Sequence, residues 1–455
     1  MSLTSRRHFV KSAALAGAAV RAAWPQRSPN EQINLGIVGI HGRGREHYNF
    51  FSKVSNVRVA FLCDIDERLF PQGVAEVEKL YGRKPETFVD IRKMLERKDL
   101  DAITVATPDH WHALHTIWAC QAGKDVYVEK PVCYCLREGR KMVEAARKYN
   151  RIVQAGLNRR CEPRIRAGAK FVREEKFGKV YRAKAIVYRG RLPIGKVPES
   201  SIPEGVNWDM FLGPAPYKPF SLNRFHYGWH FFWDTSTTEV GNNGVHYLDQ
   251  IRLAWGNKNE HPVKITCTGG LFLNESDQDV PNYQAASFEY RDGSIIDLEV
   301  TNLPTPSIGG ILEGVFFYTR QGYVTSANNW STVVGEFTAR DTPDTPTGVS
   351  NRVNRLSFPR VAYKPGPPIP DLNEPEVTHW QNFIDCVRSR KREDLRCDIL
   401  EGHMSTALCH LANIAFRTGR KLTFDPATET FPGDAEANRL LTRTYRAPYV
   451  VPDQV

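Results

Sequence analysis

The chain has 455 residues, 41% of them hydrophobic and 25% charged, so it is long enough to form two domains with separate cores. Its formal net charge is +10, but five of these charges lie in residues 1–30, which contain no Asp or Glu. The remaining excess is too small and too dispersed for a nucleic-acid-binding protein, so we expect no nucleic acid partner.

Residues 1–30 have the pattern of a twin-arginine export signal. Arg6 and Arg7 precede a weakly apolar run of nine residues, Ser12–Val20. A helix that crosses a bilayer needs about 20 apolar residues, and no later stretch is long enough either. We therefore expect a signal peptide, export to the periplasm and no integral membrane segment. The alternative is a basic N-terminus without a targeting role.

Residues 31–155 alternate short β-branched runs with amphipathic stretches, which predicts a parallel sheet with crossover helices. Strands are expected at Ile33–Val38, Val57–Leu62, Ala102–Ala106, Val126–Val128 and Ile152–Gln154. Helices are expected at Gly44–Val54, Pro71–Tyr81, Ile91–Arg97, Trp111–Ala122 and Leu136–Tyr149.

The hydrophobic period changes after Gly156, where alternating segments predict a large, mostly antiparallel sheet. Asp292-Gly293 is a hairpin signal between two expected strands, Gln284–Tyr290 and Ser294–Val300. Residues 340–373 have a loop composition, and helical patterns return at Glu376–Arg388 and Gly402–Arg417. We expect an α/β domain at 31–155, an α+β domain at 156–374, and C-terminal helices and a tail at 375–455 that pack back on both.

The first expected strand runs into a glycine-rich turn that suits a dinucleotide-binding site: Gly39, Ile40, His41, Gly42, Arg43 and Gly44. Glycines let the backbone approach phosphates, and the following helix N-terminus supplies N–H donors. His41 replaces the usual middle glycine, and an ordinary βα turn is the alternative. Asp64 ends the next strand, where a carboxylate can bind a ribose 2′-hydroxyl, so NAD is favoured over NADP.

Two more expected strands end in polar segments at the same edge of the sheet, where open α/β sheets bind ligands. Cofactor contacts are expected there from Thr107, Pro108, His110, Glu129 and Lys130. The histidines at positions 110, 112 and 115 do not suggest a metal site, because alternate positions entering a helix point apart.

Together with the segment from Gly241 to Asp249, these motifs resemble the glucose-fructose oxidoreductase, inositol dehydrogenase and MocA family (Gfo/Idh/MocA), from Ile33 to about Pro426. Glu129-Lys130-Pro131 is the most specific element. The resemblance implies a Rossmann domain, an open-faced C-terminal sheet that carries the substrate, and hydride transfer between a carbohydrate carbon and nicotinamide. It also implies a homo-oligomer formed through that sheet.

By this resemblance Lys130 hydrogen-bonds the reacting hydroxyl, and His246 takes part in the proton relay. Family members such as inositol dehydrogenase have an aspartate four residues before this histidine, whereas this chain has Asn242. Asparagine cannot take up a proton at neutral pH, so the relay is left to His246 alone, or to Glu239 or Asp249 nearby.

The segment from Arg189 to Glu239 is rich in aromatic residues, whose rings can stack on sugar rings. Substrate contacts are expected from Trp229, His230 and Trp233, together with His246. Arg159 and Arg160, which follow the last Rossmann strand, are also expected to reach the cleft.

Export of a folded protein predicts that the cofactor travels tightly bound and is regenerated on the enzyme. The chain is thus expected to be an exported NAD-dependent oxidoreductase acting on a sugar, cyclitol or glycoside. One alternative is an NAD-dependent glycoside hydrolase that uses oxidation, elimination, hydration and re-reduction. A second is a non-catalytic NAD-retaining sensor or scaffold, against which the Glu129-Lys130 pair argues.

Overall fold

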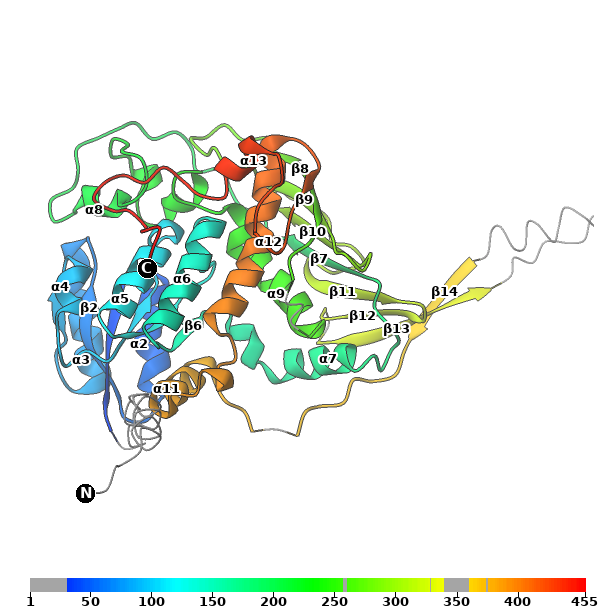
Figure 1. The fold of residues 1–455 in the computed structure, drawn as a ribbon, viewed down its shortest axis with the longest axis horizontal. Helices are drawn as coiled ribbons and strands as arrows, with labels where there is room; N and C mark the ends of the chain where they lie inside the picture. The colour runs from blue at the N-terminus through cyan, green and yellow to red at the C-terminus, as the bar shows by residue number, and fades with distance from the viewer. Residues whose placement is uncertain (1–30, 257–259, 328, 339–359, 374) are drawn as a thin grey trace, which may run out of the picture.

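The computed structural model describes residues 31–256, 260–327, 329–338, 360–373 and 375–455. Figure 1 shows two sheets, one in the blue N-terminal third and one in the green and yellow middle of the chain, with the orange helix α12 (Ile399–Thr418) between them. The expected signal peptide at residues 1–30 lies outside the described residues. None of the helices in the described ranges is both long and apolar enough to span a bilayer.

The N-terminal sheet has six parallel strands in the order β3-β2-β1-β4-β5-β6, which is the Rossmann order. The strands are β1 (Ile33–Val38), β2 (Val57–Cys63), β3 (Glu86–Phe88), β4 (Ala102–Val105), β5 (Asp125–Val128) and β6 (Val153–Ala155). The five strands expected from periodicity are present. The edge strand β3 was not expected, because its three residues are too few to show a period.

Helices connect these strands on both faces of the sheet, as a doubly wound fold requires. They are α2 (Arg43–Ser52), α3 (Phe70–Tyr81), α4 (Ile91–Leu95), α5 (His112–Gln121) and α6 (Leu136–Lys148). A 3₁₀ turn at each of Glu67–Leu69 and Asp109–Trp111 follows strands β2 and β4. Each expected helix of this domain is present, with ends shifted by one to a few residues.

The second sheet has nine strands in the order β14-β13-β12-β11-β7-β10-β9-β8-β15. Its pairs are antiparallel except for β10 with β7. The strands are β7 (Arg182–Tyr188), β8 (Lys264–Gly270), β9 (Tyr283–Glu289), β10 (Ile295–Thr301), β11 (Glu313–Thr319), β12 (Gly322–Thr325), β13 (Ser331–Thr338), β14 (Arg360–Pro365) and β15 (Leu422–Thr423). Strand β14 corrects the expectation of loop alone at 340–373; residues 339–359 are not described.

Helices α9 (Val245–Ala254) and α12 pack against this sheet, with α7 (Pro163–Arg173) against α9 and α13 (Ala435–Arg439) against α12. Helix α8 (Trp208–Leu212) lies beside the Rossmann domain, where Trp111 donates to its Met210 carbonyl, and α11 (His379–Ser389) packs against α2. Gly402 of α12 lies so close to the Rossmann domain that an added Cβ would come within 2.5 Å of the Ala155 side chain. Phe383 of α11 packs against Phe51 and Tyr127 of the first domain. The C-terminal helices therefore hold the two domains together.

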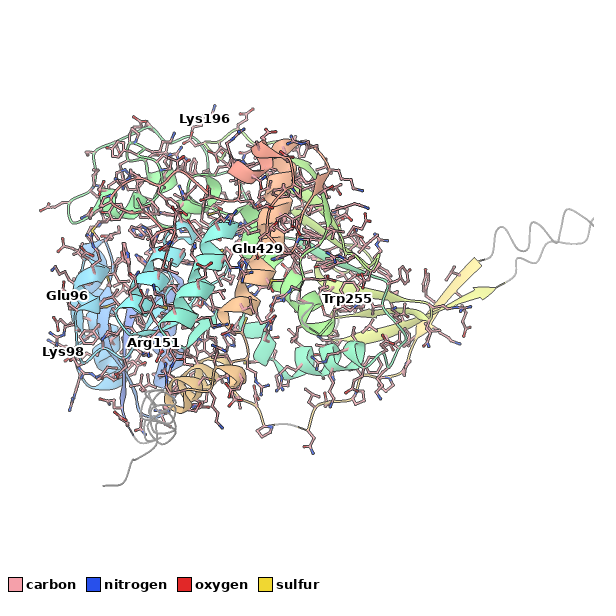
Figure 2. The ribbon with its side chains drawn as sticks, viewed as in Figure 1. Glu96, Lys98, Arg151, Lys196, Trp255 and Glu429 are labelled. Carbon is pink, nitrogen blue, oxygen red and sulfur yellow. The ribbon has the colours of Figure 1, made fainter. Side chains whose placement is uncertain are left out.

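Charged side chains such as Glu96, Lys98 and Lys196 lie at the outer edge of the molecule, whereas the labelled Glu429 lies over α12 (Figure 2). The glutamate is buried between elements of both domains, at 7% exposure.

Candidate active site

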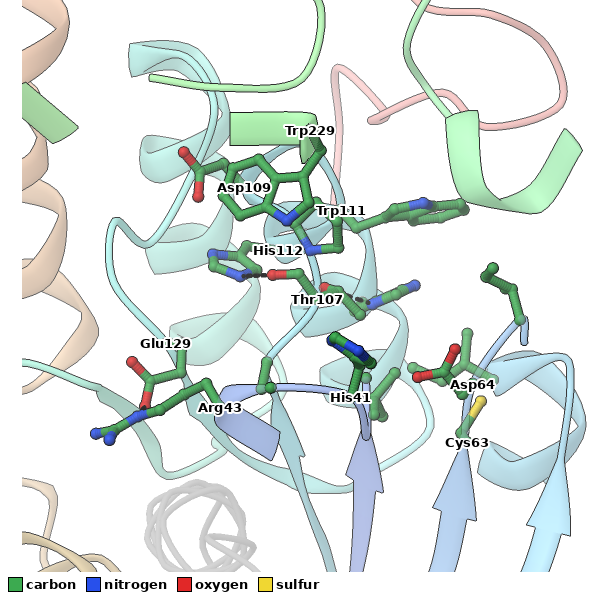
Figure 3. Close-up of a pocket in the computed structure, with 18 of the residues that line it drawn as sticks. His41, Arg43, Cys63, Asp64, Thr107, Asp109, Trp111, His112, Glu129 and Trp229 are labelled. Atoms are coloured by element: carbon green, nitrogen blue, oxygen red, sulfur yellow. Dashed lines mark hydrogen bonds and ion pairs between the residues drawn. The ribbon is translucent and has the colours of Figure 1, made fainter. Parts of the chain in front are cut away.

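A cavity of about 600 Å³ lies where the carboxyl ends of β1, β2, β4 and β5 face the second domain (Figure 3). Its volume is in the range of cofactor and substrate pockets. Most of the residues predicted for the site line it: Gly39, His41, Gly42, Arg43, Asp64, Thr107, Pro108, Glu129, Lys130, Trp229, Asn242 and His246. The tertiary structure thus brings residues from both halves of the chain to one cavity.

The glycine turn between β1 and α2 is shaped for a close ligand. Gly39 has a φ of +82°, which favours glycine, and a Cβ at Gly44 would lie 1.7 Å from the Gly39 carbonyl oxygen. Around Gly42, by contrast, a Cβ would meet nothing within 4 Å. Gly42 therefore faces open space at the N-terminus of α2, where backbone N–H groups and the helix dipole favour phosphate.

His41, which replaces the usual middle glycine, stacks on His226 of the second domain, with ring centroids 4.1 Å apart. Its side chain is therefore held against the 3₁₀ turn His226–Phe231. Asp64, at the end of β2, accepts hydrogen bonds from the backbone N–H groups of Ile40 (2.7 Å) and Asp66 (3.0 Å). Burial raises the pKa of Asp64 to about 6. The turn, the open space at Gly42 and this carboxylate together fit a nicotinamide dinucleotide.

Lys130 follows β5 and reaches across to the second domain. Its Nζ donates to both oxygens of Asn242, the backbone carbonyl at 2.8 Å and the side-chain Oδ1 at 2.9 Å. Burial lowers the pKa of Lys130, while the carboxylates of Glu129, Asp109 and Glu239 oppose that shift. The amine is therefore held in one place and biased towards its neutral, basic form.

Glu129 joins the end of β5 to helix α2. It accepts hydrogen bonds from Arg43 Nε at 2.8 Å and His47 Nε2 at 3.1 Å, as Figure 3 shows for Arg43. Burial by itself would raise its pKa, but these two partners outweigh burial and lower it. Glu129 thus stays charged, and Arg43 is held beside the glycine turn rather than free to move.

His246 lies in the first turn of α9 and lines the cavity beside Lys130 and Asn242. Burial lowers its pKa well below the usual value, so the ring is neutral. Its Nδ1 is buried and finds no hydrogen-bond partner among the described residues. Because most buried polar atoms in native proteins have a hydrogen-bond partner, this unpartnered nitrogen beside the cavity marks His246 as a candidate functional residue.

The two other relay candidates have different surroundings. Asp249 lies away from the cavity in a buried ion pair, with Arg160 Nη2 at 2.7 Å. Glu239 is adjacent to the site, because its Oε2 accepts from Asn242 Nδ2 at 3.4 Å. Of the two acids, only Glu239 contacts a residue of the cavity wall.

Five expected site residues do not line the cavity: Gly44, His110, Arg160, His230 and Trp233. Arg160 is taken up by Asp249, and the His230 ring is bonded to Glu239 at 3.2 Å. Trp233 stacks on Phe416 of α12, and His110 donates to the Phe211 carbonyl at 3.0 Å. Burial lowers the pKa of His110 to about 3. These side chains bind other protein groups around the cavity and do not line it.

Among the residues of the cavity wall that were not predicted to contact a ligand are Asp109 and His112, whereas Arg159 lines the wall as expected. Asp109 accepts from Thr237 Oγ1 (2.6 Å), and burial raises its pKa to about 7. His112 bridges the carbonyl oxygens of Pro131 (2.7 Å) and Thr107 (2.8 Å). The polar segment after β4 was the sequence signal for Asp109 and His112. The 3₁₀ turn in that segment decides which residues face the cavity, and so short a turn has no periodicity to detect.

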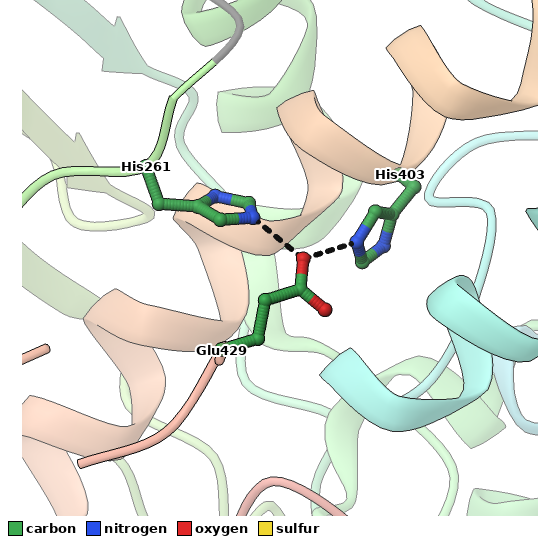
Figure 4. Close-up of side chains that lie close together, drawn as sticks. All are labelled: His261, His403 and Glu429. Atoms are coloured by element: carbon green, nitrogen blue, oxygen red, sulfur yellow. Dashed lines mark hydrogen bonds and ion pairs between the residues drawn. The ribbon is translucent and has the colours of Figure 1, made fainter. Parts of the chain in front are cut away.

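A second polar cluster, away from the cavity, contains His261, His403 and Glu429, whose ligand-type atoms lie within 4.8 Å of one another (Figure 4). Glu429 Oε1 accepts from His261 Nε2 at 2.8 Å and His403 Nε2 at 3.0 Å. Arg140 binds the same carboxylate through Nη2 at 2.6 Å and Nε at 3.1 Å. Because a guanidinium already neutralises this carboxylate, we interpret the cluster as an anchor for the C-terminal segment.

The fold and the cavity define a nicotinamide-dinucleotide-binding oxidoreductase of two domains. The family model "Oxidoreductase family, NAD-binding Rossmann fold" matches residues 33–157. The model "Oxidoreductase family, C-terminal alpha/beta domain" matches residues 187–347 and 366–451. The chain belongs to the Gfo/Idh/MocA oxidoreductase family.

Curated relatives match the chain over a limited part. An alpha-N-acetylgalactosaminidase of Shewanella oneidensis is 26% identical over 122 residues, which are 26% of this chain and 27% of that protein. A glycosyl hydrolase family 109 protein of Shewanella pealeana is 24% identical over 169 residues, 32% of this chain and 37% of that protein. The matches thus span much less than two thirds of these relatives.

Solved structures share the fold over most of the chain. The WlbA dehydrogenase of Bordetella pertussis, in complex with NADH and UDP-GlcNAcA, has a TM-score of 0.61 at 18% identity and covers 87% of this chain and 99% of its own. The aldose-aldose oxidoreductase of Caulobacter crescentus, complexed with glycerol, has a TM-score of 0.57 at 16% identity and covers 87% of this chain and 100% of its own. At these identities the likeness shows the fold alone.

Proposed function

We propose that this protein is an NAD-dependent oxidoreductase that acts on a sugar, cyclitol or glycoside, with Lys130 as the base for the reacting hydroxyl. The observation that carries the proposal is the pair of hydrogen bonds from Lys130 Nζ to the two oxygens of Asn242. A neutral amine has two N–H groups and one lone pair. With both N–H groups bound to Asn242, the lone pair is free to accept a substrate proton.

A nicotinamide coenzyme, when bound, accepts and returns a hydride. In the proposed arrangement Gly39, Gly42 and the start of α2 bind its phosphates, and Asp64 binds the adenosine ribose. The Asp64 carboxylate supports NAD over NADP, because a 2′-phosphate would bring negative charge next to it. Tight retention of the coenzyme is part of the proposal, supported by the His41–His226 stack that joins the two domains across the glycine turn.

The wall of the cavity that the second domain contributes supports a carbohydrate as the substrate. Trp229 and Tyr227 offer ring faces of the kind that stack on sugars. Arg159 lines the same cavity, with its guanidinium 4.8 Å from the centre of the Tyr247 ring, and can bind hydroxyl or carbonyl oxygens of a sugar. His246, which lines the cavity beside Lys130 and has an unpartnered Nδ1, is proposed to bind the substrate there.

A glycoside hydrolase is the second candidate, in which oxidation, elimination, hydration and re-reduction take place without net redox change. Relatives named as glycosidases favour it, although they match only part of the chain. Asn242 also favours it, because an amide does not pass the proton on from Lys130. A proton that stays on Lys130 can be returned to the same substrate when the cycle closes.

The proposal also includes export of the protein and its assembly into a homo-oligomer. Export by the twin-arginine route is supported by the pattern at Arg6 and Arg7. A homo-oligomer through the second sheet is supported by exposed aromatic side chains on it and beside it, such as Tyr363 at 65% and Tyr181 at 59% exposure.

The proposed function is tested by mass spectrometry of nucleotide released from the purified protein, followed by a panel of sugars and glycosides. A ketone or lactone product supports the oxidoreductase, and free sugar without net NADH supports the glycosidase. Bound nucleotide with no turnover on the panel would indicate a sensor or scaffold. Absence of nucleotide, with no uptake of added NAD, would contradict the proposal.

A further inference from the structure

We propose that Glu239 is a positioning residue that sets the charge state of Lys130 through the side-chain amide of Asn242. The inference rests on the proposed function, because it concerns the same amine. It assigns a role to an acidic residue that does not touch the cavity itself and that no family motif required.

The three side chains form a chain of hydrogen bonds with only one possible direction. A charged Lys130 can only donate, so it selects the oxygen of the Asn242 amide, at 2.9 Å. A charged Glu239 can only accept, so it selects the nitrogen of that amide, at 3.4 Å. Because the two ends are different, the amide cannot flip without losing both partners. Glu239 therefore holds the Asn242 oxygen towards Lys130.

The backbone around Asn242 contributes to the same arrangement. Residues Val240–Gly244 form a π-helical turn before α9, with Glu239 as the preceding residue. Such wide turns occur frequently at functional sites, because they release a backbone group from the regular helical pattern. Here the Asn242 carbonyl oxygen accepts from Lys130 at 2.8 Å. Both acceptors for the amine thus come from one turn that directly follows Glu239.

Glu239 is itself held firmly in its charged form. It is 4% exposed and accepts from His230 Nε2 at 3.2 Å, from Arg191 Nε at 3.1 Å, and from Asn243 Nδ2. Burial would raise its pKa, but the His230 bond and the Arg191 charge outweigh burial and lower it to about 2. Glu239 is therefore a constant negative charge, and the intervening amide prevents it from receiving the proton of Lys130.

The charge of Lys130 also responds to other groups around it. Glu129 lies beside it at the end of β5, Arg43 at the start of α2, and Asp109 and His112 on the segment after β4. His246 belongs to α9, Arg159 to the turn after β6, and His230 and Arg191 surround Glu239. These groups are unchanged in a Glu239 variant. A change in the protonation of Lys130 on removal of the Glu239 charge can therefore be assigned to Glu239.

The test measures the midpoint potential of the nicotinamide bound to the full protein against pH, by absorbance during a reductive titration. A change of slope in the plot of midpoint potential against pH, called the break, marks deprotonation of the lysine. If the break is absent in Lys130→Met, it is assigned to Lys130. Glu239→Gln is expected to move the break down by about one pH unit, since the ammonium loses a nearby negative charge. Glu239→Asp keeps the charge and should move it less. Glu299→Gln, which removes a carboxylate from the sheet, is the matched control and should leave the break in place.

Asn242→Ala tests the same series of hydrogen bonds at its middle residue. It also replaces Glu239→Gln if that variant does not fold. It removes one acceptor from the ammonium, so the break should again move down. An unchanged break in these folded variants would overturn the inference while leaving the proposed function intact. A protein that binds no nicotinamide coenzyme would overturn the proposed function, and the inference with it.

Discussion

The Lys130 amine lies 2.8 Å from the backbone oxygen of Asn242 and 2.9 Å from its side-chain oxygen, although the two residues are 112 positions apart. One comes from the end of a Rossmann strand and the other from a π-helical turn of the second domain. The two domains must therefore pack against each other before these two residues can meet.

Replacement of the lysine should separate chemistry from coenzyme binding. Lys130→Met is expected to lower turnover by about 10²–10⁴-fold, the usual contribution of a general base, with the glycine turn still able to bind NAD. Lys93→Met is the control, because that lysine is exposed and pairs with Glu96 on the surface. Turnover and coenzyme fluorescence are measured in parallel. Equal activity of Lys130→Met and the control would contradict the role of the amine.

Replacing Asn242 with the aspartate that the family resemblance implied for this position should raise the pKa of Lys130. In Asn242→Asp a carboxylate faces the amine and stabilises its charged form, whereas the active base is the neutral form. The acidic limb of the rate profile should therefore move to higher pH. A shift of about one unit would lower the rate about tenfold on the acidic side of the profile. Rates from pH 5 to 10 check this, and an unmoved limb would count against Lys130 as the base.

The glycine turn offers a matched pair of substitutions. Gly44→Ala would place a methyl group 1.7 Å from the Gly39 carbonyl oxygen, so it should lower stability. Gly42→Ala meets nothing within 4 Å and should leave the unfolding midpoint unchanged, yet reduce NAD affinity because the methyl group enters the phosphate cradle. Gly190→Ala, also in open space, should alter neither property. Full NAD affinity in Gly42→Ala would argue against this cradle.

Asp109 should make the protein less stable as the pH rises. Burial raises its folded-state pKa to about 7, against about 4 in an unfolded chain. The folded state thus holds this proton more tightly, and the free energy of unfolding falls between these two values and stays lower above them. Relative to wild type, Asp109→Asn should be more stable at pH 8 than at pH 5, by about 2–4 kcal/mol. Denaturant unfolding at both pH values measures the difference, which should vanish if Asp109 ionises normally.

The Glu429 cluster should behave as a structural anchor without metal. Glu429→Gln leaves Arg140 and two histidines without their charged partner and is expected to cost about 3–5 kcal/mol of folding stability. Glu436→Gln, whose partner Arg420 is on the surface, should cost less than about 1 kcal/mol. Chelator should not change the unfolding midpoint of the wild type. A large fall in that midpoint on chelation would instead indicate a bound cation.

Much of the fold could be predicted because its signals are local. Strand and helix periods, the Asp292-Gly293 turn and the glycine turn after β1 are visible within a few residues of sequence, and the structure has them where expected. Edge strands such as β3 and β14 were not predicted, because their pairing depends on partners far along the chain.

Within the site, the choice between neighbouring residues could not be made from sequence. Arg159 lines the cavity while Arg160 is bound to Asp249, and Asp109 lines it while His110 is turned towards Phe211. Adjacent residues in a 3₁₀ turn point in different directions, and an ion pair with a residue 89 positions away decides which arginine is buried.

The amino-acid sequence alone determined the types of element, the coenzyme-binding turn and the lysine after β5, because each depends on a short stretch of backbone and its neighbours. Only the tertiary structure decided that Asn242 would hold that lysine, that Glu239 would hold Asn242, and which arginine would face the cavity. These contacts join segments that meet only after the two domains have packed against each other, and no local pattern contains that information.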